Sequence, residues 1–133
     1  MTASRLDEIA STHGIRLLLQ FGSTVSGHVH ARSDVDLAVV LERGDPPLED
    51  YAGLLHDLQG LFPDQDVDLA ILNRADPLFL KQVTERCRLL HGARRDLERL
   101  KLLAFKRYQD HRRYLELERR FVAGAVAGGG ARD

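Results

Sequence analysis

The sequence predicts one α+β domain in which helices cover a small mixed sheet mainly on one face, with a long helix at the C-terminal end. The 133 residues are enough to bury a single hydrophobic core. Apolar runs of strand length and segments of helical periodicity follow one another in the order α-β-β-α-β-α-β-α. We expect the domain to span residues 1–123, and the Gly/Ala-rich residues 124–133 to form a disordered tail.

The first part of the chain contains one predicted helix and two predicted strands. Residues 4–13 place apolar side chains at helical spacing, and Gly14 follows as a stop signal. Residues 15–21 form an apolar run that is typical of a buried central strand. Residues 34–41 alternate into a second strand, and residues 24–33 between the two strands have the composition of a loop.

The rest of the chain predicts three further helices and two strands. Leucines mark one face of a helix over residues 48–61, and residues 66–72 form a third apolar strand. Proline at the first helical position favours a helix over residues 77–85. Residues 87–91 form a short fourth strand, and the pattern of residues 94–122 is that of a long helix.

Composition and charge exclude several classes of protein. The formal net charge of −1 gives no overall electrostatic reason to expect nucleic-acid binding. Cys87 is the single cysteine, so we expect no internal disulfide and a reducing, cytoplasmic environment. No apolar run reaches transmembrane length and no signal-peptide core is present, so we expect no membrane partner.

The predicted C-terminal helix carries most of the local charge imbalance. Residues 94–120 hold ten Lys or Arg residues against five Asp or Glu residues. This basic helix is either a solvated face or a docking surface for an acidic partner, and the sequence favours neither. Tyr108 and Tyr114 repeat with the leucines of the helix, so we expect them to be packing residues, and Cys87 to be a small buried apolar residue.

The turn after the first predicted strand has the composition of an anion-binding site. Gly22 tolerates a positive φ and leaves room for a bulky ligand. Backbone N–H groups and the Ser23 hydroxyl of such a turn can surround a phosphate group. We therefore expect Gly22 and Ser23 to bind phosphate.

Carboxylates at the start of the next strand indicate a metal site. Asp34 and Asp36 are two residues apart in an extended strand, so both side chains point to one face. Oxygen ligands of this kind suit a hard divalent ion such as Mg²⁺. If the third strand pairs beside the second, Asp68 would lie next to them, and the three carboxylates could hold metal around a nucleoside triphosphate. Asp66 is the rival for the third position, because it lies on the same face of that strand.

These residues resemble a known signature. Gly22-Ser23, ten residues, then Asp34-Val35-Asp36 is similar to the G-S-x10-D-x-D pattern of the nucleotidyltransferase superfamily that includes DNA polymerase beta. The small size resembles the minimal nucleotidyltransferases, the MntA-type antitoxins of HEPT–MNT toxin–antitoxin pairs. The similarity extends over about residues 5–120 and includes Val67-Asp68-Leu69.

The resemblance implies a fold, an activity and a partner. The fold would be that of the polymerase-beta-like nucleotidyltransferases. Gly22 and Ser23 would contact the triphosphate, and Asp34, Asp36 and Asp68 would be the catalytic carboxylates that bind Mg²⁺. The activity would be transfer of AMP from ATP to a tyrosine of a helical HEPT-type toxin, which neutralises that toxin in a hetero-oligomer.

One departure from the family pattern leaves other functions open. Many relatives have arginines in the pattern G-S-R-A-R-G, whereas this chain has Thr24-Val25-Ser26-Gly27 after the Gly-Ser pair. The phosphate charge would then be met by metal, backbone N–H groups or Arg32, or weakly by protonated His28 or His30. A second hypothesis is an antitoxin that acts by binding and occlusion alone. A third is nucleotide transfer to a small molecule such as an aminoglycoside, which the short chain disfavours.

Overall fold

A four-stranded mixed sheet forms the centre of the protein. The structure, a computed structural model, describes residues 3–22 and 34–132, and for residue 3 and residues 126–132 it describes the backbone alone. The strands are β1 (Ile15–Phe21), β2 (Val35–Leu41), β3 (Val67–Ile71) and β4 (Cys87–His91). Their order is β3-β2-β1-β4, so β1 is an internal strand, as its apolar sequence predicts. Strand β1 is antiparallel to β2 and β4, whereas β2 and β3 are parallel.

The helices are α1 (Ala3–His13), α2 (Leu48–Gln59), α3 (Pro77–Glu85) and α4 (Arg94–Arg132). The element order and the mixed sheet are therefore those that the sequence predicts. Gly14 stops α1 with a φ of 65°, and the Asp76 side chain caps α3 by accepting a hydrogen bond from Phe79 N at 3.0 Å. Helix α4 continues through residues 124–132, so the predicted tail has a helical backbone.

The helices cover both faces of the sheet, which corrects the expectation that they lie mainly on one face. One core cluster joins α1 and α2 to the sheet through side chains that include Leu18, Leu37 and Val39. The other joins α3 and α4 through side chains that include Leu19 and Ala38. Neighbouring residues on β1 and β2 are thus buried on opposite faces. Residues 17–19 of β1 and 37–39 of β2 are apolar at every position rather than alternating, and such segments need cover on both sides.

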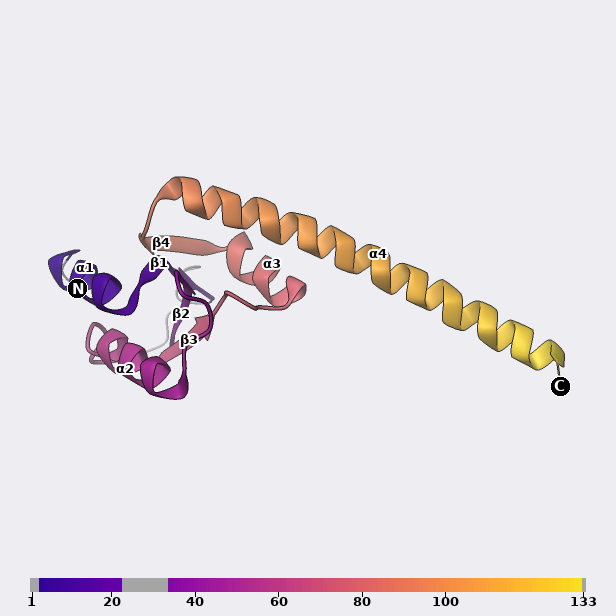
Figure 1. The fold of residues 1–133 in the computed structure, drawn as a ribbon, viewed down its shortest axis with the longest axis horizontal. Helices are drawn as coiled ribbons and strands as arrows, with labels where there is room; N and C mark the ends of the chain where they lie inside the picture. Colours follow the sequence, from indigo (N-terminus) through magenta and orange to yellow (C-terminus); the bar gives the residue numbers. More distant parts are fainter. Residues whose placement is uncertain (1–2, 23–33, 133) are drawn as a thin grey trace.

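The direction of α4 follows from the pairing of β1 with β4. Cys87 at the start of β4 lies opposite Phe21 at the end of β1, so β4 runs back toward the start of β1. Helix α4 begins there, and Asp96 in its first turn accepts a hydrogen bond from Arg16 Nη2 at 3.4 Å. Helix α4 then reverses over α3 and extends well past the sheet (Figure 1). None of the described helices has the combination of length and apolar character that crossing a membrane requires.

Candidate active site

The structure brings two of the sequence-predicted carboxylates together across the parallel strands. Asp36 on β2 is the register partner of Asp68 on β3. Asp34 precedes β2 by one residue and is exposed, as is Asp68, whereas Asp36 is half-buried. Because alternate residues of a strand share a face, Asp36 lies on the same face as Ala38, which packs in the core beneath α3 and α4. The carboxylates therefore lie at the end of the sheet where β1 ends, on the face that α4 covers.

Gly22 lies directly against the Asp36 carboxylate. Its φ of 83° is in the region that favours glycine. A Cβ atom built on Gly22 would lie 2.3 Å from Asp36 Oδ2, a separation that no side chain allows. Phe21, just before it, is the register partner of Asp36 on the other side of β2. Gly22, the described residue of the predicted phosphate-binding turn, is thus adjacent to Asp36, one of the predicted metal-binding carboxylates.

The environment of Asp36 disfavours its negative charge. Partial burial is the largest cause that raises the pKa of this carboxyl above its ordinary value, followed by the charges of Asp68 and Asp34. A bound cation would reverse this by stabilising the ionised form. Asp68 and Asp34 are therefore both close enough to Asp36 to raise its pKa, as expected for Asp68 when β3 pairs beside β2.

The carboxylates fit Mg²⁺ as a partial ligand set. Among residues 3–22 and 34–132, no group of three or more His, Cys, Asp or Glu side chains is arranged to hold a metal ion. Mg²⁺ usually takes one or two protein carboxylates and completes its shell with water and substrate phosphates, so a closed protein cage is not needed. The register pair of Asp36 and Asp68, with the charge repulsion that a cation relieves, meets that requirement.

Several predicted site residues remain untested by the geometry. Ser23, His28, His30 and Arg32 lie outside the described residues. Asp66, the rival of Asp68, precedes β3 and is exposed, and its carbonyl oxygen accepts a hydrogen bond from Val35 N at 2.8 Å.

Gln59, which no sequence pattern marks as a site residue, holds the segment that leads into β3. Its side-chain amide donates to the carbonyl oxygens of Phe62 at 2.9 Å and Gln65 at 2.5 Å. Its side-chain oxygen accepts a hydrogen bond from Val67 N at 2.9 Å. Val67 is the residue before Asp68, so Gln59 fixes the start of the strand that carries this carboxylate. A glutamine at the end of a helix gives no sequence signal for such a role.

Two further side chains fix the exposed edge and the far end of β3. The Tyr51 hydroxyl donates to the carbonyl oxygen of Leu69 at 3.0 Å, next to Asp68. At the other end, the Asn73 side chain pairs with both backbone groups of Leu41, at 2.9 and 2.7 Å, and so extends the β2–β3 pairing. Sequence periodicity places Tyr51 on the apolar face of its helix and gives no indication of its hydrogen bond.

The two tyrosines predicted to pack on the long helix differ. Tyr108 is half-buried, and the Lys81 ammonium group lies 4.7 Å from the centre of its ring. Tyr114 is 62% exposed, which corrects the expectation that it is a packing residue, because α4 has left the domain at that point. Cys87 is a free, half-buried thiol, and burial raises its pKa.

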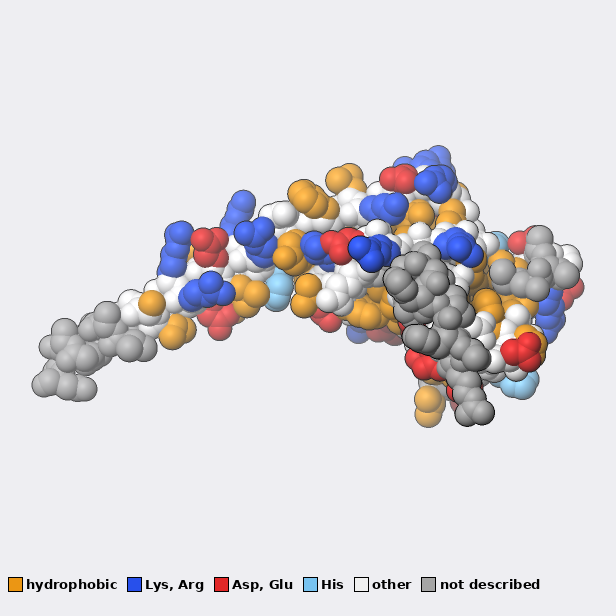
Figure 2. Space-filling model, turned by 180° about the vertical axis from the view of Figure 1, so that it is seen from behind, with side chains coloured by type: hydrophobic (Ala, Val, Ile, Leu, Met, Phe, Trp, Pro, Cys, Tyr) orange, Lys and Arg blue, Asp and Glu red, His pale blue; other side chains and the backbone are white. Residues whose placement is uncertain are grey.

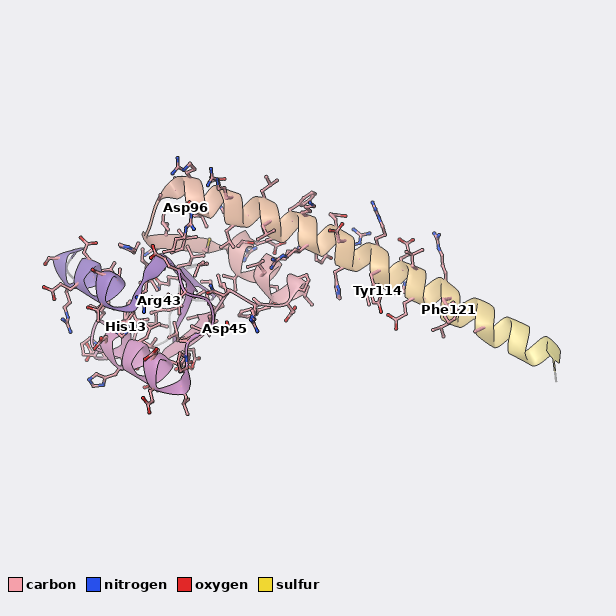
Figure 3. All side chains as sticks on the ribbon, viewed as in Figure 1. His13, Arg43, Asp45, Asp96, Tyr114 and Phe121 are labelled. Atoms are coloured by element: carbon pink, nitrogen blue, oxygen red, sulfur yellow. The ribbon has the colours of Figure 1, made fainter. Side chains whose placement is uncertain are left out.

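A cavity lies at the opposite end of the sheet from the carboxylates. Its volume is about 600 Å³, and its lining includes the ends of α1 and β2 around His13, Arg43 and Asp45 (Figure 3). His13 Nε2 lies 2.6 Å from Asp57 Oδ2, and Asp45 lies 3.3 Å from Arg74 Nε, so these polar side chains already pair within the protein. We therefore locate the candidate active site at Gly22, Asp36 and Asp68, where the geometry brings a glycine turn onto paired carboxylates.

A family model described as "Polymerase beta, Nucleotidyltransferase" matches residues 4–96 of the chain. This range contains the sheet, the glycine turn and all the predicted carboxylates. A comparison with curated proteins gave no match.

Solved structures of toxin–antitoxin complexes share the fold. One, described as a toxin–antitoxin with AMP-PNP, is 25% identical with a TM-score of 0.71, and the match covers 96% of this chain and 99% of that chain. Another contains a tri-AMPylated HEPN toxin of Shewanella oneidensis in complex with an MNT antitoxin. It is 23% identical with a TM-score of 0.64, and covers 93% of this chain and 94% of that chain. A third, a toxin–antitoxin MntA–HepT, is 23% identical with a TM-score of 0.64 and covers 93% and 95%.

Proposed function

Because this chain belongs to the polymerase beta nucleotidyltransferase family, we propose that it transfers AMP from ATP to a tyrosine of a HEPN-type toxin and thereby neutralises the toxin. The pairing of Asp36 with Asp68 beside Gly22 carries the proposal, because it joins a phosphate-binding turn to metal-binding carboxylates. The likeness to a toxin–antitoxin with AMP-PNP over 96% of the chain supports the nucleotide and the partner. The complex with a tri-AMPylated HEPN toxin supports the group transferred.

Each site residue has a distinct role in the proposed reaction. Backbone N–H groups at Gly22 and Ser23 bind the triphosphate, which the lack of a side chain at position 22 allows to approach Asp36. Asp34, Asp36 and Asp68 hold Mg²⁺, which when bound offsets negative charge on the triphosphate. Burial, and then the negative charges of Asp68 and Asp34, raise the pKa of Asp36, and a cation that offsets these charges would stabilise the ionised carboxylates.

The transfer itself is a substitution at phosphorus. The tyrosine oxygen of the toxin attacks the α-phosphorus of ATP, and the bond from that phosphorus to the oxygen of the β-phosphate breaks, so pyrophosphate leaves. The proton of the tyrosine hydroxyl passes to a carboxylate, for which we propose Asp68, because it is the more exposed member of the register pair. Most of the catalysis is positioning and charge stabilisation. We place the reaction in the cytoplasm, where ATP and a reduced Cys87 are both expected.

An intact-mass measurement tests this function. The chain is incubated with ATP, Mg²⁺ and the HEPN-type protein encoded beside it. We expect the toxin mass to increase by one or more AMP units, and the increase to be lost in Asp34→Ala/Asp36→Ala. A matched control is Asp64→Ala/Asp66→Ala, which removes two carboxylates at the same spacing just before β3. Retained transfer in this control, with loss in Asp68→Ala, would assign the third role to Asp68.

Two other outcomes would change the proposal. A stable complex with unchanged toxin mass would favour an antitoxin that acts by occlusion, a reading that the missing arginines at Thr24 and Ser26 also favour. In that case Asp34→Ala/Asp36→Ala would still neutralise the toxin in cells. If no complex and no adduct formed, the toxin would be refuted as the acceptor. A drug-resistance assay would then test an aminoglycoside acceptor.

A further inference from the structure

The far part of α4 extends from the domain without packing on any described residue. The Tyr108 ring of α4 contacts Lys81 of α3, His111 is still half-buried, and every residue from 112 to 125 is exposed. We call residues 112–125 the arm. An isolated helix gains little stability from its own hydrogen bonds in water, so an arm of this length is expected to bind something. Figure 1 shows it projecting beyond the sheet, and Tyr114 and Phe121 mark it in Figure 3.

One face of the arm is apolar. Tyr114, Leu117 and Phe121 are separated by three and four residues and therefore form one stripe along the helix. Leu115 and Val122, seven residues apart, widen this face, and Glu118 lies between them and the stripe. Between 43% and 76% of each of these five residues is exposed. A run of five large apolar residues on one face of a protruding helix is typical of a helix that enters an apolar groove.

The opposite face of the arm is basic. Arg112 and Arg119 are seven residues apart, and so are Arg113 and Arg120, which places all four on the side away from Tyr114. Glu116 on this side pairs with Arg120 at 3.3 Å. The other three arginines make no ion pair with a described residue, and Figure 2 shows blue and orange side chains interleaved along α4. Two arms paired through their apolar stripes would leave these arginines on the outer sides without an acidic partner, whereas a protein with carboxylates beside an apolar surface would pair with them, so the charge favours such a protein over a second copy of the chain.

We propose that the arm docks an apolar surface of the partner toxin that is rimmed by carboxylates. This rests on the proposed function and names the surface through which it acts. The apolar stripe would enter the toxin surface, and the unpaired arginines would meet its acidic rim. The match to the toxin–antitoxin with AMP-PNP covers 96% of this chain, which leaves fewer residues unmatched than the arm contains. A counterpart of at least part of the arm therefore exists in a chain solved with a toxin.

The position of the arm suits this role. Strand β1 ends at Gly22 and the carboxylates, and β4 begins there before running back to the start of α4. Helix α4 runs in the direction opposite to β4, so the arm extends beyond the end of the sheet that carries the carboxylates. Asp36 and α4 also belong to the same face of the sheet. A toxin held by the arm is thus kept on the side of the molecule where AMP transfer occurs, which raises the effective concentration of its tyrosine.

Binding and transfer to the toxin encoded beside this chain test the proposal. Leu117→Glu/Phe121→Glu places charge on the apolar stripe without touching the domain. We expect at least about a tenfold rise in the Kd for the toxin and in the KM for its modification, with kcat changed less than about twofold. The matched control is Leu102→Glu/Phe105→Glu, an equally exposed Leu and Phe on the same helix before the arm, 70% and 61% exposed. We expect this control to bind like the wild type. In Arg112→Gln/Arg119→Gln the affinity should depend less on salt.

The outcomes separate the arm from the function. If Leu117→Glu/Phe121→Glu bound the toxin like the wild type, or if the control lost as much affinity, the arm would not be the docking surface. AMP transfer by the wild type would still support the proposed function. If a second copy of the chain occupied the arm, mass measurement in solution would show that the wild type self-associates. Leu117→Glu/Phe121→Glu would then be monomeric and would bind the toxin as the wild type does. Vesicles of anionic lipid that bind the wild type but not the variant, again with toxin binding unchanged, would point to a membrane. A wild type that neither binds nor modifies the toxin would refute the proposed function and, with it, the docking.

Discussion

Asp36 and Asp68 are register partners on the parallel strands β2 and β3, and Gly22 lies against the first of them. Both carboxylates point to the same face because register partners in a sheet share a face, and a slip of one residue would turn Asp68 away. The site therefore depends on the register of β3 as much as on the acids themselves. The segment before β3, held by Gln59, and the segment after it, held by Asn73, set that register.

The first prediction concerns the space at Gly22. In Gly22→Ala the ideal position of the new Cβ atom is 2.3 Å from Asp36 Oδ2, so the Asp36 carboxylate would have to move. The φ of 83° would in addition be strained for alanine. We expect AMP transfer to fall by more than about tenfold, equivalent to about 1.4 kcal/mol of transition-state free energy. Unfolding free energy should fall by about 1–2 kcal/mol from the backbone strain alone. Transfer rates by intact mass and urea denaturation measure the two effects.

Gly44→Ala is the matched control for this variant. Gly44 has a φ of 86°, and nothing lies within 4 Å of the Cβ atom that alanine would add. It should lose a similar unfolding free energy through strain and keep its transfer activity. Equal loss of activity in both variants would show that the backbone strain, and not the contact with Asp36, is responsible.

The second prediction follows from the raised pKa of Asp36. Partial burial and the charges of Asp68 and Asp34 raise this pKa above its ordinary 3.8, so the native protein binds the proton more tightly than the unfolded chain. The free energy of unfolding must therefore decrease as pH rises from about 4 through the native pKa. Asp36→Asn removes the charge, so without divalent cations at pH 7 its melting temperature should exceed that of the wild type, and the difference should disappear at pH 3.

Mg²⁺ with ATP should reverse this order, because a ligand that binds the native state raises its stability and the variant has lost a carboxylate ligand. Asp64→Asn, which neutralises an exposed carboxyl in the turn before β3, should behave like the wild type in both conditions. A variant Asp36→Asn that melts below the wild type in EDTA at pH 7 would contradict the assigned cause of the pKa shift.

The third prediction concerns the Cys87 thiol. Burial is the largest cause that raises its pKa above the ordinary 9.0, and the positive charges of Lys101 and Arg94 oppose it. Because the thiolate is the reactive form, iodoacetamide at pH 8 should alkylate native Cys87 more slowly than the cysteine of the unfolded chain in urea. The sign for stability follows: a native pKa above the unfolded value makes the unfolding free energy fall as pH rises above about 9. Cys87→Ala should lack this part of the alkaline decrease, and equal alkylation rates in both states would contradict it.

The sequence predicted the elements of this fold because its local signals agree with one another. Gly14 and Pro77 mark helix boundaries, and the apolar run of β1 identifies an internal strand. The sequence also placed Asp36 and Asp68 near the starts of their strands. Their pairing does not follow from the sequence, because strand order is a long-range property that no local pattern determines.

What the sequence missed has similar causes. The cover on both faces was visible in Leu17, Leu18 and Leu19, which are all buried, yet a run of this kind does not show which helix covers which face. Helical spacing predicts a packing role for Tyr114 because that spacing continues through the arm, whereas the residues of α4 beyond His111 are exposed. Periodicity identifies a face of a helix and does not show what lies beside it.

The last prediction separates the positioning of Asp68 from the stability of its strand. Gln59→Ala removes three hydrogen bonds that hold the segment before β3, and leaves Val67 N without its side-chain acceptor next to Asp68. We expect a loss of about 1–3 kcal/mol of unfolding free energy. We also expect the Mg²⁺ concentration for half-maximal transfer to rise several-fold, because Asp68 would no longer be fixed opposite Asp36. Transfer would be measured against Mg²⁺ concentration well below the melting temperature, with the toxin concentration held constant.

Asn73→Ala is the control, because it removes two hydrogen bonds that join β3 to Leu41 at the end of the strand away from Asp68. Its loss of stability should be comparable, and its Mg²⁺ requirement should equal that of the wild type. If both variants raised the Mg²⁺ requirement equally, looseness of β3 as a whole would explain the effect, and Gln59 would have no separate positioning role. If neither raised it while Asp68→Ala abolished transfer, Asp68 would act in catalysis without holding the metal, as expected for a group that takes the tyrosine proton.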